Sequence, residues 1–392
     1  MGDVRRSAVG HEGHWWQKPF AMLQTNLREI DVDMDVNEVA SYIQRYGANA
    51  WLIGVGGIQA QYPTELPFHT RNPRVAQRRS GDLVQDALQA AHSKDLRLLA
   101  RMDFSKISAE RAAEHPEWCY RSPSGLLQTH TGDLVSVCPS AGYYQERMFD
   151  ILDEVTKRYK VDGLFINWTT MNEEDYYKRY HGVCHCFSCQ ARWNETSREK
   201  QLPTGPRDEH YTEWLEFSRE VIDGLTSRVR AFLKERLPSA CLILGKSADI
   251  MFHEANNAVG RELWHHSTSE TVSSWMSYRP DTPVLVNSTT FMGKYFSCRV
   301  TSGGIVRREL IVAFRIRRHA LSDGQRGART FRAISSSSHL KRRSSLNIHD
   351  GLSWTDSVPL YGHWQRNYTV LQEVGFHLRW PATLRHDGSC PP

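Results

Sequence analysis

The feature that most constrains this chain is a repeated alternation between short apolar segments and longer amphipathic ones, from about residue 20 to residue 295. The apolar segments have the length of strands, and the amphipathic segments place apolar residues on one face at helical spacing. Strands that alternate with helices in this way form a parallel sheet. The predicted strands are residues 21–26, 48–57, 96–104, 161–167, 241–245, 249–258 and 283–292.

The number of predicted strands, and the polar residues gathered near their ends, indicate the fold class within α/β proteins. We expect a TIM-type (β/α)8 barrel rather than an open doubly wound sheet, with the last unit incomplete or irregular. Gly47 is expected to end the first helix. In such a barrel, functional residues lie at the C-terminal ends of the strands and in the loops that follow. The predicted helical segments are residues 36–47, 81–95, 143–159 and 206–236.

The repeating pattern stops near residue 299, where the composition changes. Residues 299–350 hold 12 Lys and Arg against 3 Asp and Glu, which leaves 37 of the 49 basic residues and 41 of the 44 acidic ones elsewhere. The rest of the chain is therefore mildly acidic, so charge gives no reason to expect a nucleic-acid partner. We divide the chain into an N-terminal extension (1–17), a barrel domain (18–298) and an atypical tail rich in Arg and Ser (299–392).

Two explanations of the tail stay open. It is a disordered basic segment, or it is sequence of different origin, such as translation in a shifted frame, in place of the eighth strand and helix. We favour the second explanation, because a barrel without its last unit would leave sheet edges unpaired.

The N-terminus and the apolar runs predict where the protein resides. No apolar run approaches the roughly 18 residues that a membrane-spanning helix needs. The first residues contain two arginines but no apolar stretch behind them, which is unlike a secretory signal peptide. We therefore expect a cytoplasmic protein with reduced thiols and no membrane partner.

The sharpest local motif is formed by Cys184, Cys186 and Cys189, which place three thiols within six residues. A loop can fold thiolates at this spacing around one tetrahedral Zn²⁺, and the site then needs a fourth ligand from elsewhere. His181 and His185 are nearby candidates. The alternatives are reduced cysteines without a metal, or a disulfide pair.

The chain from Trp15 to about Met292 resembles the hypothetical glycosyl hydrolase family 6 domain, and with it the barrels of α-L-fucosidases and β-galactosidases. The resemblance implies a glycosidase that acts on a small glycoside or oligosaccharide without an organic cofactor. Family 42 β-galactosidases have a similar arrangement of cysteines, with one upstream of the three. The resemblance therefore implies that Cys138 is the fourth ligand of a closed structural zinc site. A homo-oligomer is compatible with the resemblance. The segments that carry it are residues 18–31, 46–58, 98–118, 159–168, 181–189 and 249–258.

Glycoside hydrolysis usually requires two carboxyl groups, one on each side of the scissile bond. We expect two of Glu254, Asp103 and Glu173 to supply them, and we prefer Glu254 because it ends a predicted strand. Asp103 lies two residues after Arg101 on one strand, so both face the same side and a structural ion pair is the alternative. Asn172–Glu173 is similar to the Asn-Glu pair of family 42 enzymes. The resemblance places Asn167 at the position where fucosidase-like proteins have an aspartate nucleophile.

Polar and aromatic residues at the predicted strand ends complete the expected sugar site, because an indole stacks on the C–H face of a sugar while amides and charged groups bind its hydroxyls. Asn167 and the unusual tail favour a second hypothesis, a non-catalytic carbohydrate-binding barrel. A third hypothesis is a defective product without a stable fold. The predicted substrate-binding residues are Asn26, Arg28, Glu29, Arg101, Asn167, Trp168 and His253.

Overall fold

The computed structural model describes most of the chain up to residue 289 and three short segments beyond it. For Glu254, Ala255, residues 264–267 and residues 287–289, and for the three short segments, it describes the backbone alone. The described residues are 14–27, 29–130, 133–175, 179–196, 200–243, 247–255, 264–289, 331–332, 345–346 and 371–378.

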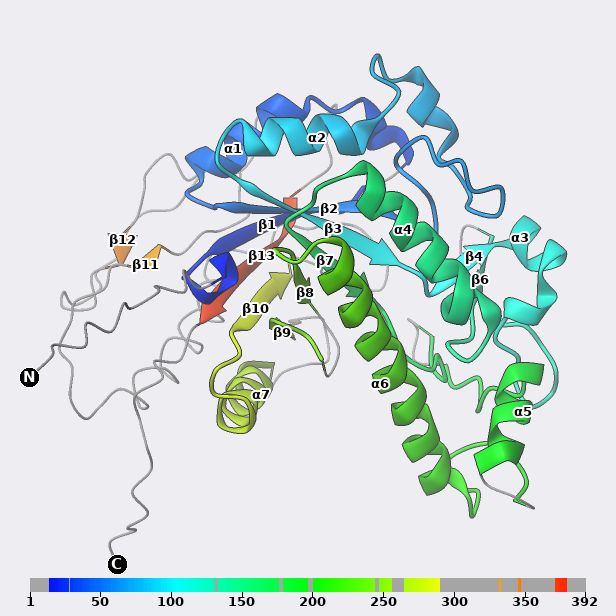
Figure 1. Ribbon diagram of the computed structural model, residues 1–392. Helices are drawn as coiled ribbons and strands as arrows, with labels where there is room; N and C mark the ends of the chain where they lie inside the picture. Colours follow the sequence, from blue (N-terminus) through cyan, green and yellow to red (C-terminus); the bar gives the residue numbers. More distant parts are fainter. Residues whose placement is uncertain are drawn as a thin grey trace, which may run out of the picture.

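A central sheet of eight strands organises the fold, in the order β8-β7-β3-β2-β1-β13-β10-β9 (Figure 1). Seven of these strands run parallel, and only β13 (Leu371–Leu378) is antiparallel, to both β1 and β10. The mixed α/β class and the parallel sheet are therefore confirmed. The parallel strands are β1 (Ala21–Thr25), β2 (Ala50–Gly57), β3 (Arg97–Asp103), β7 (Gly163–Asn167), β8 (Cys241–Ile243), β9 (Met251–Ala255) and β10 (Val284–Thr289).

The seven parallel strands fall where the sequence predicts them, and β13 comes from within the predicted tail. β13 fills the place between β1 and β10, pairing Gln24 with Glu373 and Val286 with Phe376. At the ends of the sheet, Ile243 of β8 forms a single parallel bridge with Ile250, the residue before β9.

Helices cover one face of the sheet, which we call the outer face; Figure 1 shows α1, α2 and α4 along it, and α7 beyond β9 and β10. Asp35, Asp82 and Ser108 cap α1, α2 and α3 by accepting backbone N–H groups of the first helical turn. Gly47 follows α1 with φ of 83°. No helix among the described residues is both long and apolar enough to cross a membrane. The helices are α1 (Val36–Arg45), α2 (Leu83–His92), α3 (Ala109–Glu114), α4 (Met148–Arg158), α5 (Phe187–Thr196), α6 (Tyr211–Arg236) and α7 (Trp264–Tyr278).

Strand alternation divides the core into two parts. On the outer face, buried residues such as Trp51, Leu98 and Leu164 pack against the helices. On the opposite face, which we call the inner face, the strands pack on one another through Leu99 and Phe165. The other members of this inner cluster are Trp16, Phe20, Met22, Ala50, Leu52, Cys241, Ile243, Ile250 and Leu285. Trp16 comes from the predicted N-terminal extension.

Two long connections lie beyond the C-terminal ends of β3 and β7. The first contains a small sheet of β4 (Lys106–Ser108), β6 (Leu134–Ser136) and β5 (Thr129–His130), with α3 beside it. The second, between β7 and α6, contains α5. Two short strands, β11 (Phe331–Arg332) and β12 (Ser345–Leu346), pair with each other.

Asp162 joins β3, β7 and β8 at their N-terminal ends. Its carboxylate accepts the Leu98 N–H at 2.9 Å, Arg97 Nη1 at 2.8 Å and His92 Nε2 at 2.8 Å. Its backbone carbonyl accepts the N–H of Cys241 at 3.1 Å. Only 11% of its side chain is exposed, so the Leu98 N–H depends on Asp162 rather than on water, whereas the side chains of His92 and Arg97 are also partly exposed to solvent.

Replacing Asp162 by Ala should therefore destabilise the whole sheet. We expect the free energy of unfolding to fall by about 2 kcal/mol, because the substitution leaves the Leu98 N–H without its acceptor. Asp150→Ala is the matched control: its exposed pair with Arg147 should contribute less than about 0.5 kcal/mol. Urea unfolding followed by circular dichroism checks both, and an equal effect of the two substitutions would contradict this role of Asp162.

Candidate functional site

A group of polar side chains lies at the C-terminal ends of β3 and β7, where a functional site was predicted. Asp103 and Asn167 end these two strands and are paired in register. Asn167 Nδ2 donates to Asp103 Oδ2 at 2.7 Å. Asp103 Oδ1 accepts from the Ser105 N–H at 3.0 Å and from Ser105 Oγ at 2.6 Å. In all three hydrogen bonds the neighbouring group is the donor and the Asp103 carboxyl group is the acceptor.

Two cations flank Asp103. Arg101 lies on the same face of β3, and its Nη2 is 3.8 Å from Asp103 Oδ2. Lys106, at the start of β4, is 4% exposed and donates from Nζ to Ser105 Oγ at 3.1 Å. Burial lowers the pKa of Lys106, and the Asp103 carboxylate opposes that shift. Lys106 was not among the residues predicted from the sequence; its position three residues after a strand-end aspartate was the available signal.

Trp168 follows Asn167 in the left-handed backbone region, with φ of 51°, a conformation that is rare for a bulky residue and accumulates at functional sites. Its indole N–H donates to Asn172 Oδ1 at 2.5 Å, and Tyr144 Oη donates to its carbonyl at 3.4 Å. The ring centroid lies 5.3 Å from Lys106 Nζ, within the range of a cation–π contact. Trp168 therefore lies in the same group of side chains as Lys106, and its predicted contact with a sugar stays a prediction.

The end of β2 approaches Asp103 closely, which requires glycine at position 57. Gly57 has φ of 101°, and a Cβ there would lie 2.1 Å from the Asp103 carbonyl oxygen. Its N–H donates to His69 Nε2 at 3.2 Å, and its carbonyl accepts from Tyr143 Oη at 2.8 Å. Burial lowers the pKa of His69 to about 4, which keeps the ring neutral and able to accept. His69 and Tyr143 are positioning residues that the sequence did not reveal.

Glu173 has a different environment. Its Oε1 accepts from Trp214 Nε1 at 2.6 Å, and its Oε2 accepts from Tyr180 Oη at 2.8 Å and Tyr211 Oη at 2.9 Å. Burial and this carboxylate raise the pKa of Tyr211 to about 12. Glu173 thus links the connection after β7 to α6, and these contacts do not bring it together with Asp103. Its predicted catalytic role stays a prediction.

The remaining predicted residues are spread over several places. Asn26 accepts a hydrogen bond from Gln24. Glu29 begins a short 3-10 helix and accepts Gln59 Nε2 at 2.8 Å. His253 Nε2 is 3.0 Å from Thr268 Oγ1 of α7, on the outer face and so away from Asp103. Arg28 lies outside the described residues. Glu254 is described by its backbone only, which pairs with Asn287 in β10.

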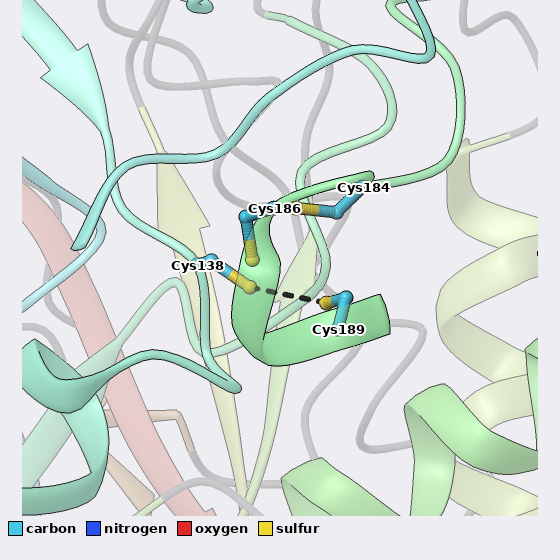
Figure 2. A group of neighbouring side chains, drawn as sticks. All are labelled: Cys138, Cys184, Cys186 and Cys189. Carbon is cyan, nitrogen blue, oxygen red and sulfur yellow. Dashed lines mark hydrogen bonds between the residues drawn. The ribbon is translucent and has the colours of Figure 1, made fainter. Parts of the chain in front are cut away.

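The four predicted cysteines do come together. Cys138 follows β6, Cys184 and Cys186 lie before α5, and Cys189 lies in its first turn; their thiols face one another in Figure 2. The four sulfur atoms lie within 4.8 Å of one another, and all four residues are buried. Cys138 Sγ and Cys189 Sγ are 3.4 Å apart. Hydrogen bonds from the other three thiols lower the pKa of Cys186, which favours a thiolate in the cluster. The cluster could hold a metal ion.

Replacing Glu173 by Gln tests its linking role. We expect a loss of about 1–3 kcal/mol in the free energy of unfolding, because the amide keeps one acceptor oxygen for three donors and loses the charge that strengthens their hydrogen bonds. Glu216→Gln, at an exposed position on α6, is the control and should have little effect. Thermal or urea unfolding distinguishes them, and unchanged stability in Glu173→Gln would show that these hydrogen bonds are dispensable.

Comparison with known proteins places a family match on this part of the chain. Residues 35–168 match the family described as Hypothetical glycosyl hydrolase 6. No curated protein matches. Similar solved structures include α-L-fucosidase isoenzyme 2 from Paenibacillus thiaminolyticus, at 14% identity over 57% of this chain and 32% of that chain, with a TM-score of 0.44.

Two further solved structures have similar scores. A β-galactosidase from the psychrophilic Marinomonas ef1 is 12% identical over 57% of this chain and 36% of that chain, with a TM-score of 0.38. A hypothetical protein from Ruminiclostridium thermocellum ATCC 27405 is 13% identical over 56% of this chain and 94% of that chain, with a TM-score of 0.36. The chain thus spans about a third of the fucosidase and of the β-galactosidase. The predicted resemblance to the Hypothetical glycosyl hydrolase 6 family is confirmed over residues 35–168, which include Arg101, Asp103, Cys138, Asn167 and Trp168.

Proposed function

We propose that this protein is a glycosidase whose substrate binds on the inner face, at the C-terminal ends of β3 and β7. The observation that carries the proposal is the register pair Asp103–Asn167, a carboxylate and an amide joined at 2.7 Å at the place where parallel α/β folds bind ligands. Both residues lie within the segment that matches the glycosyl hydrolase family. We infer that the sheet closes into the predicted barrel, and the Ile243–Ile250 bridge supports this closure.

Asp103 would act as nucleophile or base, because its neighbours donate hydrogen bonds to it and orient its oxygens. Asn167 and Arg101 would bind sugar hydroxyls beside it. The second carboxyl group has to stand farther away than a hydrogen bond, at about 5–9.5 Å depending on whether the mechanism retains or inverts the anomeric configuration. Glu254 of β9 is our candidate for it, because it stands two residues after Phe252, which packs against the inner cluster.

A panel of 4-nitrophenyl glycosides tests the catalytic proposal. Asp103→Asn should lower kcat about 10²–10⁴-fold, since the amide can neither attack nor accept a proton. Glu254→Gln should lower it similarly. Asp150→Asn, at a surface position on α4, is the control and should keep full activity. Full activity in both Asp103→Asn and Glu254→Gln would overturn the assignment of these two carboxyl groups.

The second candidate function is carbohydrate binding without turnover. It is favoured by the neutral Asn167 at the end of β7, where the resemblance implies an acidic residue. Isothermal titration calorimetry distinguishes it from the first: sugar binding that Asp103→Asn weakens, with no hydrolysis of any glycoside in the panel, would support a binding protein.

We propose that Cys138, Cys184, Cys186 and Cys189 hold a structural Zn²⁺. Four buried sulfur ligands within 4.8 Å of one another match the tetrahedral, sulfur-rich sites that zinc prefers. A Zn²⁺ bound there would cross-link the connections after β3 and β7 without entering the reaction. Among the described residues the four thiolates would complete its coordination, which leaves no position for a substrate.

Metal analysis tests this site. We expect one zinc ion per chain by mass spectrometry, its loss in Cys186→Ser, and a lower melting temperature in that variant, because a closed zinc site contributes directly to folding. Cys119→Ala, a buried cysteine outside the cluster, should keep the metal. A metal-free chain of unchanged stability would contradict a zinc site.

A further inference from the structure

The two carboxylate oxygens of Asp103 have different surroundings. Oδ1 accepts two hydrogen bonds from Ser105, one from its N–H at 3.0 Å and one from its Oγ at 2.6 Å. Oδ2 accepts one, from Asn167 Nδ2 at 2.7 Å, and its 3.8 Å distance from Arg101 Nη2 is an ion pair without a hydrogen bond. Each carboxylate oxygen can accept about two hydrogen bonds. Within the described part of the chain, Oδ1 is therefore saturated, whereas Oδ2 can accept one more hydrogen bond.

The two oxygens also differ in how close they lie to solvent. On the side of Oδ1, Ser105 is fully buried and Lys106 is 4% exposed. On the side of Oδ2, a quarter of the Arg101 side chain is exposed, and Asn167 is partly exposed as well. These two residues are also the ones that we propose to bind sugar hydroxyls. A ligand would therefore reach Asp103 on the side of Oδ2.

Lys106 fixes the direction of the Ser105 hydroxyl group. Its Nζ donates to Ser105 Oγ at 3.1 Å, and an ammonium group has no lone pair with which to accept. The single hydroxyl hydrogen of Ser105 is therefore directed at Asp103 Oδ1. The 2.6 Å distance between these oxygens is typical of a hydrogen bond from a hydroxyl group to a carboxylate. Together with the backbone N–H, the hydroxyl group holds Oδ1 in place, and this fixes the rotation of the whole carboxylate.

We propose that Asp103 reacts through Oδ2, and that Ser105, oriented by Lys106, is a positioning residue that holds Oδ1 and so turns Oδ2 toward the sugar. This inference rests on the proposed glycosidase. It adds the reacting atom of Asp103 and a positioning residue that was not predicted from the sequence.

The step at Oδ2 depends on the stereochemical outcome. In a retaining reaction, a lone pair of Oδ2 forms the bond to the anomeric carbon. The bond from that carbon to the leaving oxygen breaks, and the leaving oxygen keeps the electron pair and takes the proton of the second carboxyl group. In an inverting reaction, Oδ2 takes a proton from the water whose oxygen attacks the anomeric carbon, and the leaving oxygen is protonated in the same way. In both cases Ser105 keeps its hydrogen bonds to Oδ1.

The kinetics of Ser105 variants on the 4-nitrophenyl glycosides test the positioning role. Ser105→Ala keeps the backbone N–H but loses the hydroxyl group, so kcat should fall about tenfold, as expected for one hydrogen bond to a charged group. KM should stay within about threefold, because the groups proposed to bind the sugar are unchanged. Ser105→Thr keeps the hydroxyl group and should restore most of kcat. Ser140→Ala is the matched control: it is a buried serine whose hydroxyl group has no partner among the described residues, and this variant should keep full activity.

A double variant tests whether Lys106 acts through Ser105. Lys106→Met keeps most of the length of the side chain but cannot donate to the hydroxyl group. If Lys106 orients Ser105, the loss of kcat on combining Lys106→Met with Ser105→Ala should be smaller than the product of the two single losses. Losses that multiply would overturn the orienting role of Lys106. Melting temperatures identify the variants that are folded and can be compared.

A crystal structure of the full chain with the sugar of the panel that binds most tightly tests the reacting atom. The Asp103 oxygen nearest to the anomeric carbon should be the one that accepts from Asn167, and Ser105 should still donate to the other. If the sugar approaches the oxygen that Ser105 holds, this inference is overturned and the proposed glycosidase stands. The same holds if Ser105→Ala keeps full kcat while Asp103→Asn is inactive. If Asp103→Asn keeps full activity, or if no glycoside is hydrolysed, the proposed role of Asp103 fails and this inference fails with it.

Discussion

The parallel pairing of β3 with β2 and β7 is the constraint on which the candidate site depends. Asp162 holds β7 against β3 near their N-terminal ends, and the parallel register then pairs Asp103 with Asn167 on one side and with Gly57 on the other. Alternation along β3 then puts Arg101 and Asp103 on the inner face and leaves Leu98 and Ala100 for the helices. One strand therefore supplies both the packing of the outer core and the charges of the site.

The connections after β3 and β7 depend on each other, and this coupling links the cysteine cluster to the site. Cys138 belongs to the connection that begins with Ser105 and Lys106, whereas Cys184, Cys186 and Cys189 belong to the one that begins with Trp168. A bound metal would join the two connections at their far ends, while the contact of Lys106 with Trp168 joins them at the strand ends. Glu173 fixes the second connection to α6 through Trp214. The contacts of the two connections thus hold β3 and β7 at their C-terminal ends, while Asp162 holds them at their N-terminal ends.

Much of this arrangement could be predicted from the sequence, because periodicity and spacing are local signals. The seven parallel strands and the cysteine motif belong to that part, and so does the shared face of Arg101 and Asp103. The contact between Glu173 and Trp214 spans 41 residues, and no local pattern encodes which donors a loop carboxylate will meet. Lys106 was missed because the turn into β4 brings it back over the strand end. The antiparallel β13 was missed because alternation of strands and helices predicts only parallel neighbours.

The hydrogen bond between Asn167 and Asp103 also limits how a hydrolase could work here. At 2.7 Å, two carboxylates in these positions would repel each other, and one of them would have to be protonated. An asparagine avoids this conflict and fixes the orientation of the single carboxylate. As a consequence, β7 contributes no second acid. The two carboxyl groups of a glycosidase lie about 5–9.5 Å apart, a distance that fits a residue across the inner face better than one beside Asp103 on β3 or β7. Under the proposed hydrolase function, the partner of Asp103 would therefore come from another strand across the inner face, and Glu254 of β9 is the residue that we propose.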